Sequence, residues 1–267
     1  MNVIVEHSTG QYRFANIDGV IFDKDGTIAQ VEDYLGQLHR ARLQQLSLCS
    51  TAQVDPINHQ FGVRPQGIDP TGLLAVGSRW ENETVMAAHL VENRGASGEN
   101  MLSWIAARQQ VAAAFTQAAA ALPEKATQTP LMPGALQLLD QLQGAGRKVA
   151  IASADSQAAV SAFVEYHHLG PRLSHWQGVT ASLPDKIQPD FLRQVCQSMG
   201  VKPGQVLVCG DSASDWLMAQ VGHVVGFIGF TGGWAVPPRL HPPEGASGAM
   251  QHITIDQLSC VSVEVTA

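Results

Sequence analysis

The chain has 267 residues, of which 45% are hydrophobic and 15% charged, and its formal net charge is -7 at pH 7. This length and apolar content suit one large domain or a core domain with a smaller second one, and they exclude a largely disordered chain. The negative charge and the lack of a long basic run argue against a nucleic-acid partner, and no apolar stretch approaches the roughly 18 residues of a membrane span. The four cysteines are widely spaced and no secretion signal pattern is present, so we expect a cytoplasmic protein.

An apolar run near the start of the chain ends on two acids. Val20 to Phe22 predict a buried strand, and Asp23, Asp25 and Gly26 follow it. Open α/β sheets bind ligands at the carboxyl ends of their strands, so the two carboxylates are a candidate site. Taken alone, the same residues also fit a strand end followed by an ordinary Asp-Gly turn. Residues 1–18 are a polar mixture that we expect to add an edge strand before the buried one.

From about residue 31 to residue 130 the pattern becomes helical. Apolar residues at helical spacing predict helices over 34–48 and 81–92, and the alanine-rich stretch 100–122 predicts a third. Prolines and glycines predict loops and short helices over 55–78. The sequence therefore predicts an all-helical block of roughly 100 residues, the size of a small domain.

After this block, short apolar runs alternate with helical stretches. Strands are predicted over 148–152, 176–180, 206–209 and 224–228, and helices over 134–143, 157–166, 189–199 and 215–221. Such alternation implies parallel strands joined by right-handed crossovers. We therefore predict a Rossmann-like, doubly wound parallel sheet in an α/β core domain of residues 1–29 and 131–267, with residues 30–130 inserted as an α-helical domain. The glycine-rich run from Gly226 to Gly233 lacks the spacing of a dinucleotide-binding motif and predicts a flexible turn after the last core strand.

Four short motifs follow the predicted core strands. They contain Asp23 and Asp25, then Ser153, then Lys186, then a segment with two further acids, Asp211 and Asp215. Because the carboxyl ends of parallel strands lie on one edge of the sheet, we expect these motifs to converge. Crowded carboxylates repel one another unless a cation lies among them, and hard oxygen ligands suit Mg²⁺. A lysine and a hydroxyl beside that metal suit a phosphoryl group.

The order and spacing of these motifs also resemble those of a known family. DKDGT at 23–27, the serine after IA at 151–153, Lys186 and GDSASD at 210–215 resemble the motifs of haloacid dehalogenase superfamily phosphatases with an inserted α-helical cap, the subfamily IA type. The phosphoglycolate-phosphatase-like group is the most similar in pattern. Two positions depart from it: the lysine motif keeps only the second proline of Lys-Pro-x-Pro, and Ser153 stands where many members have threonine.

The resemblance implies a role for each motif residue. Asp23 would attack phosphorus and carry an aspartyl-phosphate, and Asp25 would protonate the leaving alcohol and later activate water. Ser153 and the backbone amide of Ala154 would hold phosphoryl oxygens, and Lys186 would neutralise their charge.

The metal ligands also come from the resemblance. Asp23, the backbone carbonyl of Asp25, and Asp211 would bind Mg²⁺, while Asp215 would hold metal-bound waters or orient Lys186. Asp155 is expected to cap the helix after Ser153 and to take no part in the chemistry.

We therefore expect a Mg²⁺-dependent phosphomonoesterase acting on a small phosphorylated metabolite, with phosphoglycolate as first candidate by resemblance. A sugar phosphomutase shares the aspartate pair and stays an alternative, and a catalytically inactive binding or regulatory protein is a third. Family members that cleave carbon–halogen bonds lack the second acid, so Asp25 favours phosphoryl chemistry. The sequence leaves the substrate and the oligomeric state, monomer or homodimer, open.

Overall fold

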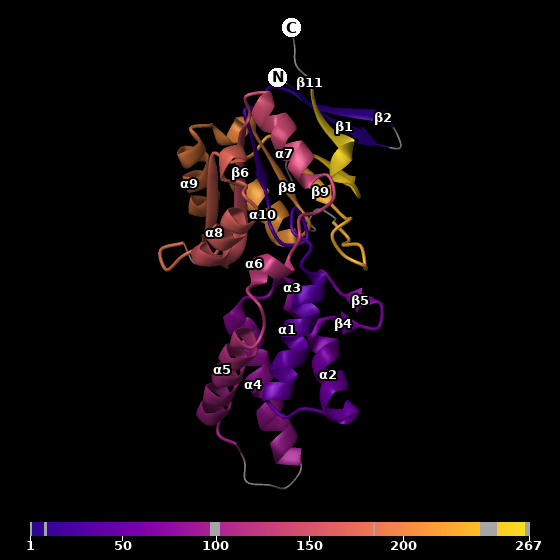
Figure 1. The fold of residues 1–267 in the computed structure, drawn as a ribbon, viewed down its shortest axis with the longest axis vertical. Coiled ribbons are helices and arrows are strands. Elements are labelled where there is room, and N and C mark those ends of the chain that lie inside the picture. Colours follow the sequence, from indigo (N-terminus) through magenta and orange to yellow (C-terminus); the bar gives the residue numbers. More distant parts are fainter. Residues whose placement is uncertain (1, 8–9, 97–101, 184, 241–249, 265–267) are drawn as a thin grey trace. The chain divides into compact units, whose positions relative to one another are not determined.

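The computed structural model describes residues 2–7, 10–96, 102–183, 185–240 and 250–264. The chain forms two compact units, one of Met1–Val31 with Thr129–Ala267 and one of Glu32–Gln128 (Figure 1). The sequence placed the boundaries at 29/30 and 130/131. The larger unit contains every motif singled out above.

A six-stranded, wholly parallel sheet forms the centre of the larger unit. Its order is β10-β9-β8-β3-β6-β7. The bounds are β3 (Gly19–Phe22), β6 (Lys148–Ser156), β7 (His175–Val179), β8 (Val206–Gly210), β9 (Gly226–Phe230) and β10 (Gln251–Ile255). From β3 the chain adds β6 and β7 on one side, and then returns to add β8, β9 and β10 on the other. This reversal confirms the doubly wound α/β fold and makes the carboxyl ends of β3 and β8 the expected ligand site.

The central strands are buried along their whole length. Every residue of β3, β8 and β9 is buried, which explains why these strands are uninterrupted apolar runs. The flanking helices are α7 (Ala135–Gly144), α8 (Gln157–Tyr166), α9 (Pro189–Met199) and α10 (Ala213–Val221), with short 3₁₀ turns at Gly170–Arg172, Pro203–Gln205 and Leu258–Cys260. Phe191 of α9 and Trp216 of α10 belong to one buried cluster with Val208 and Phe227 of the sheet.

The N-terminal segment forms a second sheet, which corrects the expectation of an added edge strand. β1 (Asn2–His7) pairs antiparallel with β2 (Gly10–Phe14) and with β11 (Val261–Glu264), so the first and last strands lie side by side (Figure 1). Its partner β11 lies some 250 positions away in sequence, so local patterning did not reveal the pairing. Strand β10 was not predicted either, although it lies only 25 positions from its partner β9, from Gly226 to Gln251. Its pairing makes the run from Gly226 an internal strand instead of a flexible turn after the last one.

The smaller unit is mainly helical. It comprises α1 (Glu32–Gln45), α2 (Thr51–Phe61), α3 (Leu73–Val76), α4 (Arg79–Ala96), α5 (Trp104–Ala120) and α6 (Lys125–Gln128). It also contains a small hairpin of β4 (Val63–Arg64) and β5 (Gly67–Ile68), so the prediction of an all-helical block was wrong in this part.

The prediction of loops and short helices over 55–78 gave neither the start nor the length of α2, because Pro56 lies inside it. A capping box between Ser50 and Gln53 begins the helix, and Gly62 ends it in the left-handed region at φ 79°. Burial of Ile57 and Phe61 stabilises it despite the proline. Among the described residues, no helix has the length and apolar character needed to cross a membrane.

Candidate active site

The motif residues meet at the carboxyl edge of the central sheet. Asp23 follows β3, and its backbone amide donates to the carbonyl of Cys209 on β8 at 2.8 Å. This bond aligns the ends of the two strands at which the chain reverses direction. Asp211 follows β8 directly, and Lys186 lies in the connection between β7 and α9. The fold therefore brings together residues that are up to 192 positions apart, from Asp23 to Asp215.

Asp23, Asp211 and Asp215 form a buried acidic cluster. Each offers a carboxylate oxygen, and these atoms lie within 4.8 Å of one another. Burial is the largest cause that raises the pKa of Asp23, to about 7; Lys186 opposes this shift, and Asp215 and Asp25 add to it. Burial and then the charges of Asp23 and Asp215 raise the pKa of Asp211 well above its usual range. Without a further cation, the buried carboxylates of Asp23 and Asp211 are therefore poorly stabilised in their charged form.

Lys186 is the cation that faces this cluster. Its side chain is buried and forms ion pairs with Asp23 and, at 2.5 Å, with Oδ1 of Asp215. Burial alone lowers the pKa of Lys186, but Asp215 and Asp23 outweigh it and raise the pKa above its usual value. Three carboxylates and one ammonium leave two negative charges, which is the charge that one Mg²⁺ neutralises. The all-oxygen donor set is also the one that Mg²⁺ prefers, so these residues fit the metal.

Asp215 is fixed by the start of α10. Its Oδ2 accepts hydrogen bonds from the amides of Asp211 and Ser212, at 3.1 and 3.0 Å, and from the Ser212 hydroxyl at 2.7 Å. Ser212 caps the same helix, so the two side chains form a capping box. The other oxygen of Asp215 faces Lys186. Of the two roles expected for Asp215, orienting Lys186 is therefore the one with a contact in the structure.

Asp211 is held by two side chains that the sequence analysis did not single out for this purpose. Its Oδ2 accepts a 2.6 Å hydrogen bond from the indole nitrogen of Trp234, and its Oδ1 accepts a 3.2 Å bond from the Thr27 hydroxyl. Trp234 is buried and follows the glycine pair after β9. Gly232 and Gly233 were the sequence feature that could have indicated this contact, since glycines often occur where another segment of backbone approaches closely. A Cβ on Gly233 would lie 1.8 Å from the carbonyl oxygen of Gly26, so only glycine fits there.

Asp25 lies outside the three-carboxylate cluster. Its Oδ1 is 2.5 Å from the ammonium of Lys24, which also lies 2.8 Å from Oδ2 of Asp155. The helix cap expected of Asp155 is wrong, because Ser156 caps α8 and accepts from the amide of Ala159. Asp155 instead joins β6 to the loop after β3 through Lys24.

Ser153 and Ala154 lie near the end of β6. The hydroxyl of Ser153 is buried and accepts a 3.2 Å hydrogen bond from the amide of Asp155, while Ala154 is exposed. The register between β6 and β7 shifts between Ala152 and Ser156, so this segment leaves the regular ladder. The edge of the sheet therefore places the buried hydroxyl of Ser153 next to the exposed residue Ala154.

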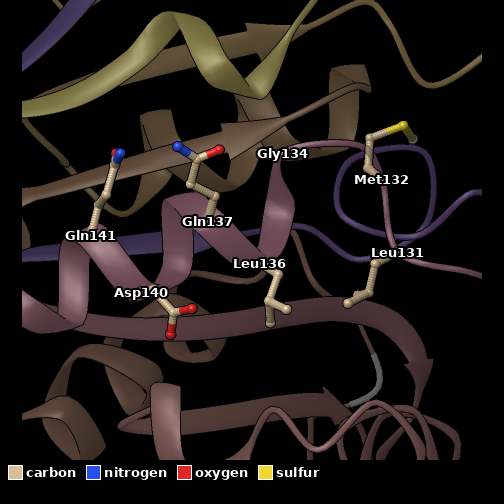
Figure 2. Close-up of a pocket in the computed structure, with 7 residues that line it drawn as sticks. All are labelled: Leu131, Met132, Gly134, Leu136, Gln137, Asp140 and Gln141. Carbon is tan, nitrogen blue, oxygen red and sulfur yellow. The ribbon is translucent and has the colours of Figure 1, made fainter.

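A broad hollow elsewhere in the larger unit has a different character. It has a volume of about 750 Å³, and Figure 2 shows that its lining comes from α7 and the segment before it: Leu131, Met132, Gly134, Leu136, Gln137, Asp140 and Gln141. Nε of Arg172 forms an ion pair with Oδ1 of Asp140 at 2.6 Å. The hollow contains none of the motif carboxylates, so the candidate active site is the edge of the sheet.

Comparison with known proteins agrees with the fold and with the motifs. The family model of haloacid dehalogenase-like hydrolases matches residues 17–223. The chain therefore belongs to the haloacid dehalogenase-like hydrolases. A search of curated proteins found no match.

Several solved structures share the fold at low sequence identity. A "putative phosphoglycolate phosphatase" from Lactobacillus delbrueckii subsp. bulgaricus is 22% identical, with a TM-score of 0.60 over 90% of this chain and 95% of its own. A predicted phosphoglycolate phosphatase from Haemophilus somnus is 15% identical, with a TM-score of 0.54 over 90% and 95%. A dehalogenase is 16% identical, with a TM-score of 0.51 over 92% and 96%. These similarities show a common fold and leave the reaction to the site residues.

Proposed function

We propose that this hydrolase is a Mg²⁺-dependent phosphomonoesterase that acts on a small phosphorylated metabolite through an aspartyl-phosphate on Asp23. The observation that carries the proposal is the buried cluster in which Asp23 faces Lys186 and lies beside Asp211. An isolated aspartate on the surface would lack both the ammonium that faces Asp23 and the neighbouring carboxylates that could bind a metal with it. Two neighbours in fold named as phosphoglycolate phosphatases support the same substrate class.

The metal would be held by Asp23, Asp211 and the backbone carbonyl of Asp25. When bound there, Mg²⁺ would supply positive charge for the phosphoryl oxygens and for the Asp23 carboxylate. Trp234 and Thr27 would keep Asp211 in place for this purpose, since each occupies one of its oxygens.

The protein residues would then divide hydrolysis into two transfers. In the first, an Asp23 oxygen bonds to phosphorus, the bond to the leaving oxygen breaks, and Asp25 gives its proton to the departing alkoxide. Ser153 and the Ala154 amide hold phosphoryl oxygens while Lys186 balances their charge. In the second, Asp25 takes a proton from water as that water attacks phosphorus, which releases phosphate and restores Asp23.

Asp25 is the residue that favours a phosphatase over a dehalogenase, although a dehalogenase is among the neighbours in fold. Cleaving a carbon–halogen bond releases halide, which needs no proton, whereas an alkoxide leaving group does. We propose that residues 30–130 act as a cap that excludes water and selects the leaving group, with phosphoglycolate as first candidate substrate. The cytoplasmic location stays a prediction from the sequence.

A screen of phosphorylated metabolites with Mg²⁺, comparing kcat/KM, tests the proposal. We expect phosphate release from small phosphomonoesters by the wild-type protein and none above background by Asp23→Asn. Hydrolysis that survives Asp23→Asn would show that the nucleophile is another residue. Hexose 1-phosphate separates the phosphomutase alternative, because a mutase returns the 6-phosphate and a phosphatase releases free phosphate.

A further inference from the structure

Lys24, between the two motif aspartates, is a buried cation. Its side chain is 1% exposed, and its ammonium lies 2.5 Å from Oδ1 of Asp25 and 2.8 Å from Oδ2 of Asp155. The same ammonium lies 5.3 Å from the centre of the Phe163 ring on α8. The role expected for each motif residue leaves Lys24 without a function.

Burial of a lysine ammonium is costly unless anions compensate it, so a position this buried requires both carboxylates. The ring of Phe163 adds a further favourable contact for the charge. Three groups from separate segments therefore hold the ammonium at one point. A side chain held in this way has little freedom to move away from Asp25.

The backbone of Lys24 is held as firmly as its side chain. Its carbonyl accepts from the amides of Ile28 and Ala29, at 3.0 and 2.9 Å, and from Thr27 at 3.3 Å. The chain turns at Gly26, where φ is 81°. Adjacent side chains point to opposite sides of a regular strand, so the contact between Lys24 and Asp25 shows that the chain has left strand geometry here. Lys24 thus links the loop after β3 to the end of β6, and its own backbone is held by these hydrogen bonds.

The carboxylate of Asp25 is more accessible than those of the clustered acids. Its side chain is 24% exposed, whereas those of the three clustered acids are nearly inaccessible. A proton donor works only within hydrogen-bond reach of its acceptor, and a displacement of about 1 Å can cost about 100-fold in rate. The residue that holds this carboxylate therefore bears directly on proton transfer.

We propose that Lys24 is a positioning residue for Asp25: anchored by Asp155, it holds the Asp25 carboxylate in one orientation for proton transfer to the leaving group. The inference rests on the proposed function, in which Asp25 is the proton donor. In this role Lys24 acts through the Asp25 carboxylate and not directly on the substrate.

Paired phosphate esters test the inference, because only one of them needs the proton. The nitrophenolate of p-nitrophenyl phosphate leaves without protonation, whereas the alkoxide of ethyl phosphate requires it. The value of kcat/KM reports the steps up to phosphoryl transfer, so the ratio of the two esters measures the contribution of the acid. Asp25→Asn sets the scale, with an expected loss of about 100-fold or more confined to ethyl phosphate.

For Lys24→Met we expect kcat/KM for ethyl phosphate to fall at least about tenfold more than for p-nitrophenyl phosphate. Lys24→Arg keeps the cation and should recover most of the ratio, and Asp155→Asn, which removes the anchor alone, should change it in the same direction by less. Arg172→Met breaks the Arg172–Asp140 ion pair in the same unit and should leave the ratio unchanged.

The outcomes separate the two claims. If Asp25→Asn changes the ratio but Lys24→Met and Asp155→Asn lower both esters equally or neither, the inference on Lys24 is wrong and the proposed function stands. If Asp25→Asn leaves the ratio unchanged, the proton-donor role fails, and Lys24 loses its proposed purpose with it. A crystal structure of Lys24→Met, or of Asp155→Asn if the former does not fold, gives a readout without activity: an unmoved Asp25 carboxylate overturns the inference.

Discussion

The indole nitrogen of Trp234 donates a 2.6 Å hydrogen bond to Oδ2 of Asp211, so a side chain from the turn after β9 holds the carboxylate that follows β8. Both residues are buried, and Thr27 donates to the other oxygen of the same carboxylate. Partners of this kind orient metal-binding groups, and their mutation typically costs about tenfold to a hundredfold in metal affinity or activity.

Trp234→Phe removes the indole N–H while keeping an aromatic ring. We expect Mg²⁺ affinity to fall by about tenfold, because outer partners of metal ligands typically contribute tenfold or more. Titration calorimetry of the protein with MgCl₂ measures this without substrate. Trp216→Phe is the matched control, since Trp216 is also buried and its indole nitrogen has no hydrogen-bond partner within the described part of the chain. Equal affinities in the two variants would contradict the role of Trp234.

Binding of Mg²⁺ should also stabilise the folded protein. A ligand at about 100 times its Kd adds about 2.7 kcal/mol to the free energy of unfolding, so Tm should rise with MgCl₂ and fall back with EDTA. Asp211→Asn should lose most of this shift, because it removes one ligand. Asp185→Asn, an exposed acid one residue before Lys186, should keep it. If MgCl₂ raised the Tm of Asp211→Asn as much as that of the wild-type protein, the metal would bind elsewhere.

Lys186→Met tests the balance of charge in the acidic cluster. Without Mg²⁺, the variant removes the ammonium that pairs with Asp23 and Asp215 within the described part of the chain, which costs about 3 kcal/mol or more in the free energy of unfolding. Mg²⁺ should therefore stabilise Lys186→Met more than the wild-type protein, as measured by urea unfolding with EDTA and with MgCl₂. Activity should fall by about 100-fold even with the metal, because the phosphoryl charge loses a partner. A variant as stable as the wild type in EDTA would show that Lys186 does not compensate these acids.

The smaller unit contains a buried histidine that makes its stability depend on pH. Burial of His39 lowers its pKa to about 4 from the ordinary value of 6.5, and its Nε2 lies 2.9 Å from Oδ1 of Asn58. The unfolded chain therefore binds a proton between pH 6.5 and 4 that the folded chain does not, so stability falls as pH decreases through this range.

Between pH 7 and pH 5 we expect a loss of about 2 kcal/mol from this one group. His39→Gln, which keeps a side chain able to bond to Asn58, should remove this part of the pH dependence. The exposed His59→Gln serves as the matched control. Hydrogen exchange of α1 and α2 amides, compared at pH 7 and pH 5 after correction for intrinsic rates, measures the effect in this unit. An unchanged pH dependence in His39→Gln would contradict the assignment.

Much of the core could be predicted because its local patterns are strong. Strands β3, β6, β7 and β8 begin within one residue of their predicted positions. For β3 and β8 the reason is that a buried parallel strand is a continuous apolar run. The bounds of helix α2 and the sheet of β1, β2 and β11 were not predicted. In α2, burial of Ile57 and Phe61 offsets the local effect of Pro56, and β1 and β11 are joined only by pairing across the whole chain.

The sequence by itself determined the class of fold, the family motifs and their order along the chain, because each depends on residues that are neighbours in sequence. Only the tertiary structure decided which side chains hold the acids: Trp234 on Asp211, Lys186 between Asp23 and Asp215, and Lys24 between Asp25 and Asp155. These contacts join segments that meet at the edge of the sheet after the chain has folded. Which partner a buried charge pairs with depends on the packing of the folded chain, and the spacing of residues along the sequence does not give the distance between the two charged groups.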